Sequence, residues 1–253
     1  MLCGHGNLPT MNTLPAWIIT DLDETLLLSD RTLTDRTLSA LTAIRQLGVH
    51  FGIATTRSKG FAQILLDQLK PNLAVLSGGA MVLIDEKVVY RQSLDSQELH
   101  HLLTHLDQLG DVQAISIDTP QGRIGKYESY PIPFEQEVYS MFIWLSEPMN
   151  IEKAHLRYPN TVFTHLWEPN MYRASHIKAT KDGALKYVLK DINPQDVLCF
   201  GDDLMDVGML EHFNGVAVSN AHPKALNAAT AITKSNNEEG VAHYLEHLLS
   251  FLA

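Results

Sequence analysis

Several features that mark other protein classes are missing from this chain of 253 residues. It has only two cysteines, Cys3 and Cys199, which excludes a disulfide framework and favours a reducing, cytoplasmic location. No apolar run is long enough to predict a membrane span. The first residues lack the basic start and the apolar core of a signal peptide, and Met11 is an alternative start to Met1.

Positive charge is also scarce. Lys and Arg number 19 against 29 Asp and Glu, which gives a formal net charge of −10. A surface this negative argues against nucleic acids and anionic membranes as partners, although a local site can still accept a small anion. The fractions of apolar residues (45%) and charged residues (19%) are ordinary, so a disordered or fibrous chain is excluded.

The first and last thirds of the chain alternate between two kinds of pattern. Short apolar runs at 17–20, 49–54 and 73–76 predict strands, and segments with helical spacing at 35–47 and 61–69 separate them. This alternation predicts a parallel sheet with helices on both faces. The last third repeats it, with helices predicted at 182–189, 204–212, near Pro223 and over 238–252, and strands at 196–200, 215–218 and near Ile232.

The middle of the chain differs from its two ends. Runs at 81–84 and 88–90 predict a hairpin. We expect an α/β core formed by residues 1–91 and 178–253, with 1–15 as a tail, and an inserted α+β module at 92–177. In the insert we expect helices at 96–109 and 150–157, strands near 112–117, 141–145, 161–167 and 171–177, turns at prolines such as Pro131 and Pro133, and Trp144 and Trp167 packed in its sheet.

Two acidic clusters directly follow predicted strands. Asp21 and Asp23 come after 17–20, and residues two apart in an extended chain point to the same side. Adjacent carboxylates repel unless they share a proton or a cation, and Mg²⁺ prefers such oxygen ligands. Asp202 and Asp206 follow the strand at 196–200 in the same way. Helix capping explains one aspartate of that cluster but not the group.

Two weaker features lie near other predicted strand ends. Thr55 and Thr56 follow the strand at 49–54, where a hydroxyl and backbone N–H groups could hold a phosphate oxygen. An ordinary strand-to-helix turn explains the same residues equally well. Lys181 opens the helix predicted at 182–189, and Lys178 is the rival lysine three residues earlier.

Together these pieces resemble the four motifs of the haloacid dehalogenase superfamily. They are the Asp21-Leu-Asp23-Glu-Thr box, the Thr55-Thr56-Arg57 turn, the late lysine and the Gly-Asp202-Asp-Leu-Met-Asp206 box. Segments 215–221 and 233–241 are similar to the Cof-type phosphatases, which carry an α+β cap between the second and third motifs. The likeness spans about 17–252. Three residues depart from it: Glu24 and Thr56 stand where the family usually has Gly, and Gly78 stands where Asn is common.

The resemblance implies a Rossmann-like parallel-sheet core with an inserted cap, and a Mg²⁺-dependent phosphatase of small phosphorylated metabolites such as sugar phosphates. Asp21 would be the nucleophile that forms an aspartyl-phosphate, and Asp23 would be the general acid and base. The catalytic Lys181 would hold Asp21 in its ionised form. The phosphoryl group would be bound by Asp21, Thr55, Thr56 and Lys181. The metal would be held by Asp21, the backbone carbonyl of Asp23, Asp202 and Asp206.

Other interpretations stay open at this point. A phosphomutase of the same fold and a non-catalytic sugar-phosphate sensor are the alternatives, and the intact acidic boxes count against the sensor. His101 and His105 lie one helical turn apart, but without a third ligand we interpret them as a solvated helix face. Residues that could contact substrate from the insert, although surface charge is their commoner role, are Arg123, Lys126, Arg157, Arg173 and His176.

Overall fold

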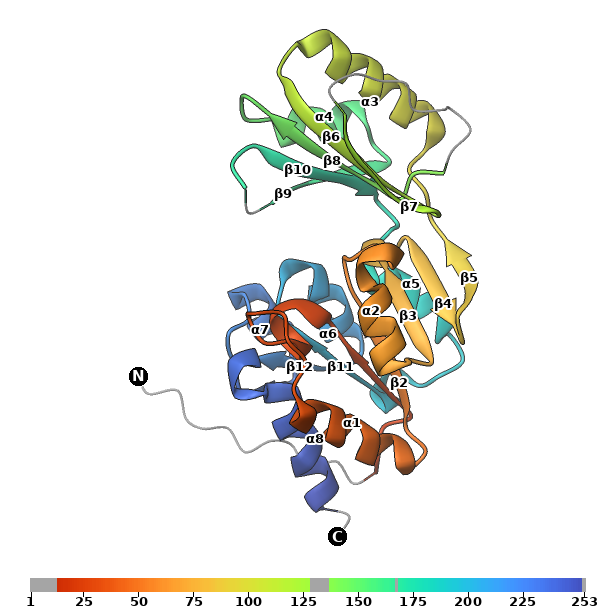
Figure 1. Cartoon of the computed structure of the whole chain (residues 1–253), viewed down its shortest axis with the longest axis vertical. Helices are drawn as coiled ribbons and strands as arrows, with labels where there is room; N and C mark the ends of the chain where they lie inside the picture. The colour runs from red at the N-terminus through yellow and green to blue at the C-terminus, as the bar shows by residue number, and fades with distance from the viewer. Residues whose placement is uncertain (1–12, 128–136, 167, 252–253) are drawn as a thin grey trace.

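Two separate sheets lie one above the other in the computed structural model, which describes residues 13–127, 137–166 and 168–251 (Figure 1). The larger sheet has eight strands in the order β13-β12-β11-β1-β2-β3-β4-β5. All its pairings from β13 to β3 are parallel, and β4 and β5 add an antiparallel hairpin at one edge. The strands are β1 (Trp17–Thr20), β2 (His50–Ala54), β3 (Leu73–Leu76), β4 (Met81–Ile84), β5 (Lys87–Arg91), β11 (Val197–Gly201), β12 (Asn214–Val218) and β13 (Ala231–Thr233).

Helices cover both faces of this sheet because its central strands are apolar on both sides. Ile18 of β1 packs with α1 (Asp35–Gln46), α2 (Lys59–Leu69) and α8 (Gly240–Ser250). Its neighbour Ile19 packs on the opposite face with α5 (Lys181–Val188) and α6 (Val207–His212). Helix α7 (Pro223–Ala228) packs against α6 and β12. Because both faces are buried, the sheet exposes mainly its strand ends to ligands.

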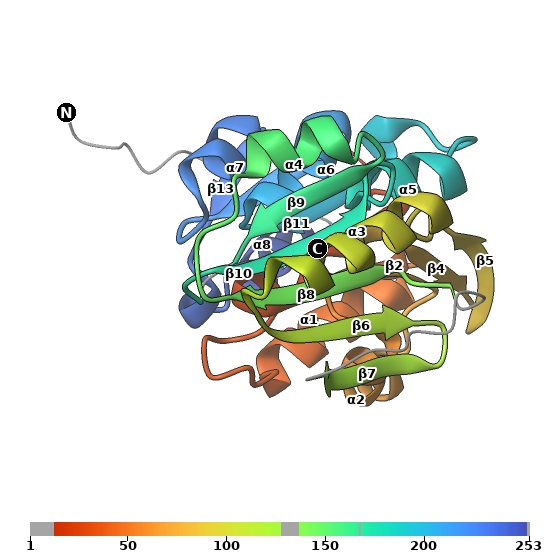
Figure 2. The ribbon, with the colours of Figure 1, turned by 90° about the horizontal axis from the view of Figure 1, so that it is seen from above.

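The smaller sheet has five strands in the order β7-β6-β8-β10-β9, and all its pairings are antiparallel. Helices α3 (Ser96–Leu109) and α4 (Ile151–Arg157) pack on one face, around Ile115, Ile143 and Tyr172. The other face is turned toward the larger sheet (Figures 1 and 2). Its strands are β6 (Val112–Thr119), β7 (Gly122–Tyr127), β8 (Ser140–Leu145), β9 (Thr161–His165) and β10 (Met171–His176).

Most predicted elements of the described chain are present, with ends shifted by a residue or two. The segment at 204–212 is an exception, because it forms a short 3₁₀ turn (Leu204–Asp206) before α6 begins. Strand β7 was not predicted, since its sequence Gly-Arg-Ile-Gly-Lys-Tyr lacks an alternating pattern. Predictions for Cys3, for the tail up to residue 12, for Pro131 and Pro133, and for Trp167 lie outside the described residues.

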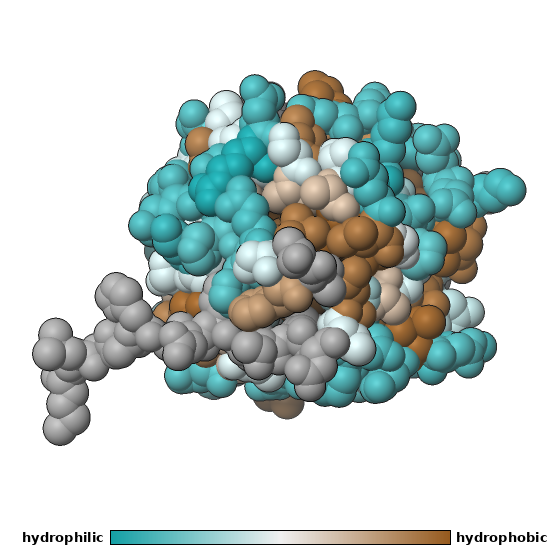
Figure 3. Space-filling model, turned by 90° about the horizontal axis from the view of Figure 1, so that it is seen from below, coloured by the Kyte–Doolittle hydropathy of each residue, from teal (hydrophilic) through white to brown (hydrophobic). Residues whose placement is uncertain are grey.

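On the face opposite the smaller sheet, hydrophilic residues surround a hydrophobic area toward the middle of the view (Figure 3). Among the described residues, Leu47 and Phe251 are two of the half-exposed apolar side chains. None of the helices in the described ranges combines the length and the apolar character that crossing a bilayer requires.

Candidate active site

The predicted site residues follow strands that are neighbours in the larger sheet. Thr20, the last residue of β1, pairs in parallel register with Phe200 of β11 and with Ile53 of β2. Asp21 therefore lies beside Asp202 on one flank and beside Thr55 on the other. The backbone continues this order past the strand end, since Asp21 N donates to the Phe200 carbonyl at 2.9 Å. Parallel topology thus brings three distant sequence segments to one sheet edge.

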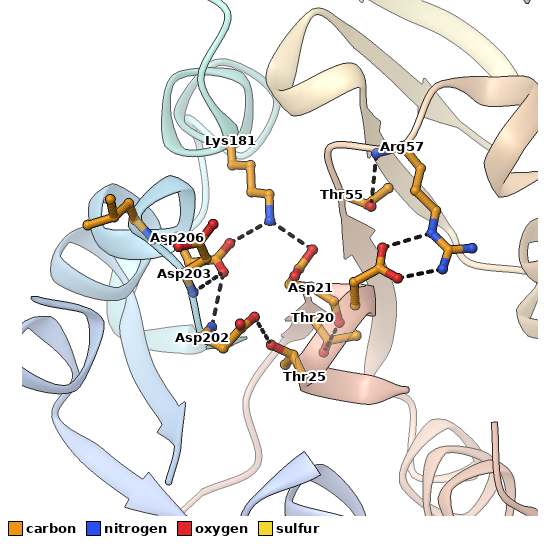
Figure 4. Close-up of polar contacts among 11 residues, drawn as sticks. Thr20, Asp21, Thr25, Thr55, Arg57, Lys181, Asp202, Asp203 and Asp206 are labelled. Carbon is orange, nitrogen blue, oxygen red and sulfur yellow. Dashed lines mark hydrogen bonds and ion pairs between the residues drawn. The ribbon is translucent and has the colours of Figure 1, made fainter. Parts of the chain in front are cut away.

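Lys181 lies at the centre of the cluster (Figure 4). Its Nζ donates to Asp21 Oδ1 at 2.8 Å and to Asp206 Oδ1 at 2.6 Å, and the lysine is only 1% exposed. Thr180 caps α5 by accepting from Gly183 N, which fixes Lys181 as the first residue of that helix. The rival candidate, Lys178, is exposed on the chain leading to the helix. The structure thus brings Lys181, rather than Lys178, to Asp21.

Asp206 is held in place by the backbone of the loop that precedes it. Its Oδ2 accepts from Asp202 N at 3.0 Å and from Asp203 N at 3.1 Å. Gly201 makes this close approach possible, because a Cβ atom there would lie 2.5 Å from Asp206 Cβ. Asp202 in turn accepts a hydrogen bond of 2.6 Å at Oδ1 from Thr25 Oγ1, which links the two acidic boxes directly.

Burial and the charges of neighbouring groups shift the pKa values of Asp21, Asp202 and Lys181. Burial raises the pKa of Asp21 well above its usual value, and Asp206 and Asp202 add to the rise while Lys181 opposes it. Burial also raises the pKa of Asp202 to about 6. The Lys181 ammonium loses stability on burial, but the charges of Asp206 and Asp21 outweigh this loss and raise its pKa. The cluster therefore has more negative charge than one lysine balances.

Carboxylate oxygens of Asp21, Asp202 and Asp206 all lie within 4.8 Å of one another. Hard divalent cations take oxygen ligands, and a cation here would relieve the repulsion that raises the pKa values of Asp21 and Asp202. The donor set therefore fits a divalent metal ion. Among the described residues, no other cluster of His, Cys, Asp or Glu brings three ligands together in this way.

Replacing Asp202 with Asn should remove a metal ligand and, in the absence of metal, stabilise the fold. A carboxyl whose pKa is raised on folding stabilises the protein below its unfolded pKa, and this contribution is lost as the pH rises through about 6. At pH 8 the metal-free Asp202→Asn protein should therefore gain about 1–2 kcal/mol over wild type, with little gain near pH 4. Thermal unfolding at both pH values measures this.

The same variant should lose its stabilisation by Mg²⁺. Wild type should melt at a higher temperature with Mg²⁺ at pH 8, and less so near pH 5, where a proton competes for Asp202. Asp203→Asn is the matched control, because Asp203 is exposed and caps the following turn. An equal Mg²⁺ response in the Asp202→Asn protein and in wild type would contradict the metal assignment.

Asp23 takes a different position from the other carboxylates. Its side chain is 40% exposed and forms a two-pronged ion pair with Arg57, with Nε to Oδ2 at 2.8 Å and Nη2 to Oδ1 at 2.5 Å. The carboxylate is therefore oriented by the loop after β2 rather than by Lys181. Arg57 was predicted as part of a motif but without a partner, and the available signal was a basic residue two positions after Thr55.

The two predicted phosphate-binding threonines differ in exposure. Thr55 is fully buried, and its Oγ1 accepts from Arg57 N at 3.1 Å, which leaves the hydroxyl proton free to point elsewhere. Thr56 is exposed in the same loop. Glu24 has a left-handed backbone (φ 56°), which explains why a glycine suits that position. Its carboxylate accepts from Ser29 Oγ at 2.7 Å, and its carbonyl accepts from Asn220 Nδ2.

The candidates in the smaller sheet and its helices are dispersed. Arg157 contacts a ring nitrogen of His105 at 3.2 Å on the outer face, and His101 is exposed. Trp144 donates from Nε1 to Glu168 at the sheet. Arg173 is the exception to the expectation of surface charge, because it is only 3% exposed. A charged residue in the middle of an antiparallel strand gave no sign of this burial.

Comparisons with known proteins agree with this arrangement. Residues 18–142 and 135–245 match the family model described as haloacid dehalogenase-like hydrolase. A protein of Bacillus subtilis (strain 168) named "Putative phosphatase YxeH" is 28% identical over 267 residues, which cover 92% of this chain and 97% of that protein. The chain therefore belongs to the haloacid dehalogenase-like hydrolases, and it is a phosphatase, a phosphoric monoester hydrolase, of that family.

Solved structures share the fold. A hypothetical protein from Geobacillus kaustophilus HTA426 has a TM-score of 0.82 at 23% identity, covering 93% of this chain and 99% of that one. A sugar phosphatase of haloacid dehalogenase subclass IIB has a TM-score of 0.75 at 20% identity, covering 91% and 98%. These likenesses confirm the predicted class, an α/β parallel sheet with the haloacid dehalogenase fold.

Proposed function

We propose that this protein is a Mg²⁺-dependent phosphatase that hydrolyses small phosphorylated metabolites, sugar phosphates among them, through an aspartyl-phosphate on Asp21. The observation that carries this proposal is the buried ion pair from Lys181 to Asp21 and Asp206 at the edge of the parallel sheet. A lysine in this position holds Asp21 ready to act as a nucleophile and faces the place where phosphoryl charge builds up. Sugar phosphates are proposed because a structural relative is named as a sugar phosphatase.

The residues divide the chemistry between them. Asp21 attacks phosphorus, and the leaving alcohol takes a proton from Asp23; Asp23 then removes a proton from the water that hydrolyses the aspartyl-phosphate. Arg57 orients the Asp23 carboxylate for both transfers. Thr55, Thr56 and Lys181 bind the phosphoryl oxygens. The buried Lys181 supplies the strongest of these contacts, because its charge is least screened by water.

The residues that would hold Mg²⁺ are Asp21, Asp202 and Asp206, together with the backbone carbonyl of Asp23. A bound Mg²⁺ ion supplies positive charge that offsets the repulsion between the nucleophile and the phosphoryl group. Asp206 is fully buried and bonded to Lys181 and to two backbone N–H groups, so its role is to fix the site's shape as well as its charge.

We propose the division of the chain that the sequence suggests. Residues 1–91 and 178–253 form the catalytic core, with 1–15 as a tail, and residues 92–177 form a cap that sets substrate choice. The support is that the smaller sheet, α3 and α4 all lie within 92–177, and that this sheet turns one face toward the core (Figure 1). A cytoplasmic location fits the buried thiol of Cys199, whose pKa is raised by burial.

A panel of phosphorylated metabolites, assayed for released phosphate with and without Mg²⁺, tests this function. We expect turnover of at least one sugar phosphate and of a simple aryl phosphate, loss of both activities in excess chelator, and recovery when Mg²⁺ is restored. Full activity in chelator would contradict the metal requirement. Binding without any turnover would favour a sensor, and turnover that needs a bisphosphorylated activator would favour a mutase.

A further inference from the structure

Arg173 is a buried cation on the face of the smaller sheet that is turned toward the core. It lies on β10, opposite Phe142 of β8, and its side chain is 3% exposed. Its neighbours Tyr172 and Ala174 pack on the opposite face with α3 and α4, so alternation along the strand directs Arg173 away from them. The guanidinium reaches across to the core, where Nη2 donates to the Ser77 carbonyl at 2.8 Å.

Among the described residues, no carboxylate is bonded to the Arg173 guanidinium. Nη1 donates to Ser175 Oγ at 3.0 Å, and buried Nε has no hydrogen-bond partner. The acid that acts on it, Asp118, is already paired with Arg123 at 2.7 Å and accepts from Ser140. Two arginines and one aspartate leave this cluster with an excess of one positive charge, in a chain whose net charge is −10.

A buried guanidinium bonded only to neutral oxygens is costly, because its hydration is lost and the carboxylate that acts on it, Asp118, is already paired with Arg123. Burial accordingly lowers the pKa of Arg173 to about 10. Both the charge and the unused Nε–H group would be satisfied by an anionic oxygen, which arginine recognises well. The carboxylate oxygens of Asp118, which act on Arg173 from within the protein, are already bonded to Arg123 and Ser140.

Gly78 supplies the room for this guanidinium. A Cβ atom at position 78 would lie 2.8 Å from Arg173 Nη2, and the glycine has a φ of +67°. An asparagine side chain at this position would occupy the space that Arg173 fills here, so Gly78 and Arg173 form a matched pair.

The loop that Arg173 contacts adjoins the phosphoryl-binding residues. Gly78 N donates to the Thr55 carbonyl at 2.9 Å, and Ser77 N donates to the Arg57 carbonyl at 2.8 Å. Gly79 packs against Thr180, the residue before Lys181, where a Cβ atom would lie 2.1 Å from the Thr180 carbonyl oxygen. Arg173 is therefore one short loop from both Thr55 and Lys181.

We propose that Arg173 is a specificity-determining residue that binds a second anionic group, a carboxylate or a second phosphoryl group, on the alcohol portion of the substrate. The inference rests on the proposed phosphatase function and narrows its substrates to doubly anionic phosphate esters. Ser175 Oγ and the Ser77 carbonyl, which accept from Nη1 and Nη2, position the guanidinium.

Matched substrates that differ in one anionic group test this role and separate the two sources of charge. Glycerol 3-phosphate is compared with 3-phosphoglycerate, and fructose 6-phosphate with fructose 1,6-bisphosphate. p-Nitrophenyl phosphate, which has no second anionic group, measures phosphate-ester hydrolysis itself. Wild type should favour the doubly anionic member of at least one pair by tenfold or more in kcat/KM. Arg173→Gln should lower that preference by about ten- to a hundredfold, mainly through KM, because a charge-assisted bond is lost.

Hydrolysis of p-nitrophenyl phosphate should change less than threefold in Arg173→Gln. Gly78→Asn should cause the same loss of preference with Arg173 itself unsubstituted, since Asn tolerates the left-handed backbone and its side chain displaces the guanidinium. Arg157→Gln is the control, because Arg157 lies on α4 at the outer face and contacts His105. It should keep the wild-type preference.

Two results would overturn the proposal. One is a wild-type enzyme that hydrolyses p-nitrophenyl phosphate yet favours neither doubly anionic substrate. The other is an equal loss for every substrate in both Arg173→Gln and Gly78→Asn, which would make Arg173 a purely structural link between cap and core. Failure of wild type to hydrolyse even p-nitrophenyl phosphate would instead contradict the proposed function on which the inference rests.

Discussion

Asp21→Asn is expected to lower kcat by about 10⁴-fold or more, because an amide oxygen cannot take the place of the attacking carboxylate. The substitution keeps the side chain's size and leaves an acceptor for the Lys181 ammonium, which donates to Asp21 Oδ1 at 2.8 Å. Released phosphate, measured at saturating substrate and Mg²⁺, gives the loss directly.

The melting temperature is the control that distinguishes a catalytic defect from misfolding. Burial raises the pKa of Asp21, so its ionised form disfavours the metal-free fold. The Asp21→Asn protein should therefore melt no lower than wild type in the absence of metal at neutral pH. Substantial residual turnover in a purified, folded Asp21→Asn protein would argue that another group attacks phosphorus.

Lys181→Ala should cause the second large effect, on both activity and stability. Removing the ammonium leaves Asp21 and Asp206 as buried carboxylates without their shared partner, and breaking a buried pair in this way typically costs about 3–5 kcal/mol. Turnover should fall by about 10³-fold or more, since the loss of one preorganised charged donor near the developing oxyanion is already severe. Steady-state kinetics and thermal unfolding measure the two effects.

Lys178→Ala is the matched comparison, because that lysine is exposed three residues earlier on the same connection. We expect less than a twofold change in its activity and no measurable change in its melting temperature. Lys181→Met, which keeps most of the buried side-chain volume, should share the activity loss of Lys181→Ala. A larger loss in Lys178→Ala than in Lys181→Ala would show that Lys178, and not Lys181, is the catalytic lysine.

The parallel sheet was predictable because its signals are local. Runs such as Trp17-Ile-Ile-Thr and Val197-Leu-Cys-Phe are short, apolar and followed at once by aspartates, so their strand character and their functional ends can both be read from the sequence. Adjacency at the sheet edge then follows from parallel topology. For the same reason Asp21, Asp202 and Asp206 could be expected to meet, as their separation within 4.8 Å shows they do.

What the sequence did not indicate depends on tertiary contacts. The pairing of Asp23 with Arg57 follows from the course of the loop after β2, which no periodicity encodes. Strand β7 lacks alternation and forms because β6 offers it a free edge. The burial of Arg173 needs Gly78 to leave space and the smaller sheet to face the core, and both conditions arise only once the two sheets are placed.

The most direct test of the proposed chemistry is to look for the phosphoryl group on Asp21. In the Asp23→Asn protein, hydrolysis of the aspartyl-phosphate should slow, since that variant lacks the base that activates water. Rapid acid quenching of this protein with Mg²⁺ and a radiolabelled phosphate ester, followed by peptide mass spectrometry, should find one phosphoryl group on Asp21 and none after the further change Asp21→Asn. Release of phosphate with no label on Asp21 at any time, or label on another residue, would contradict the account.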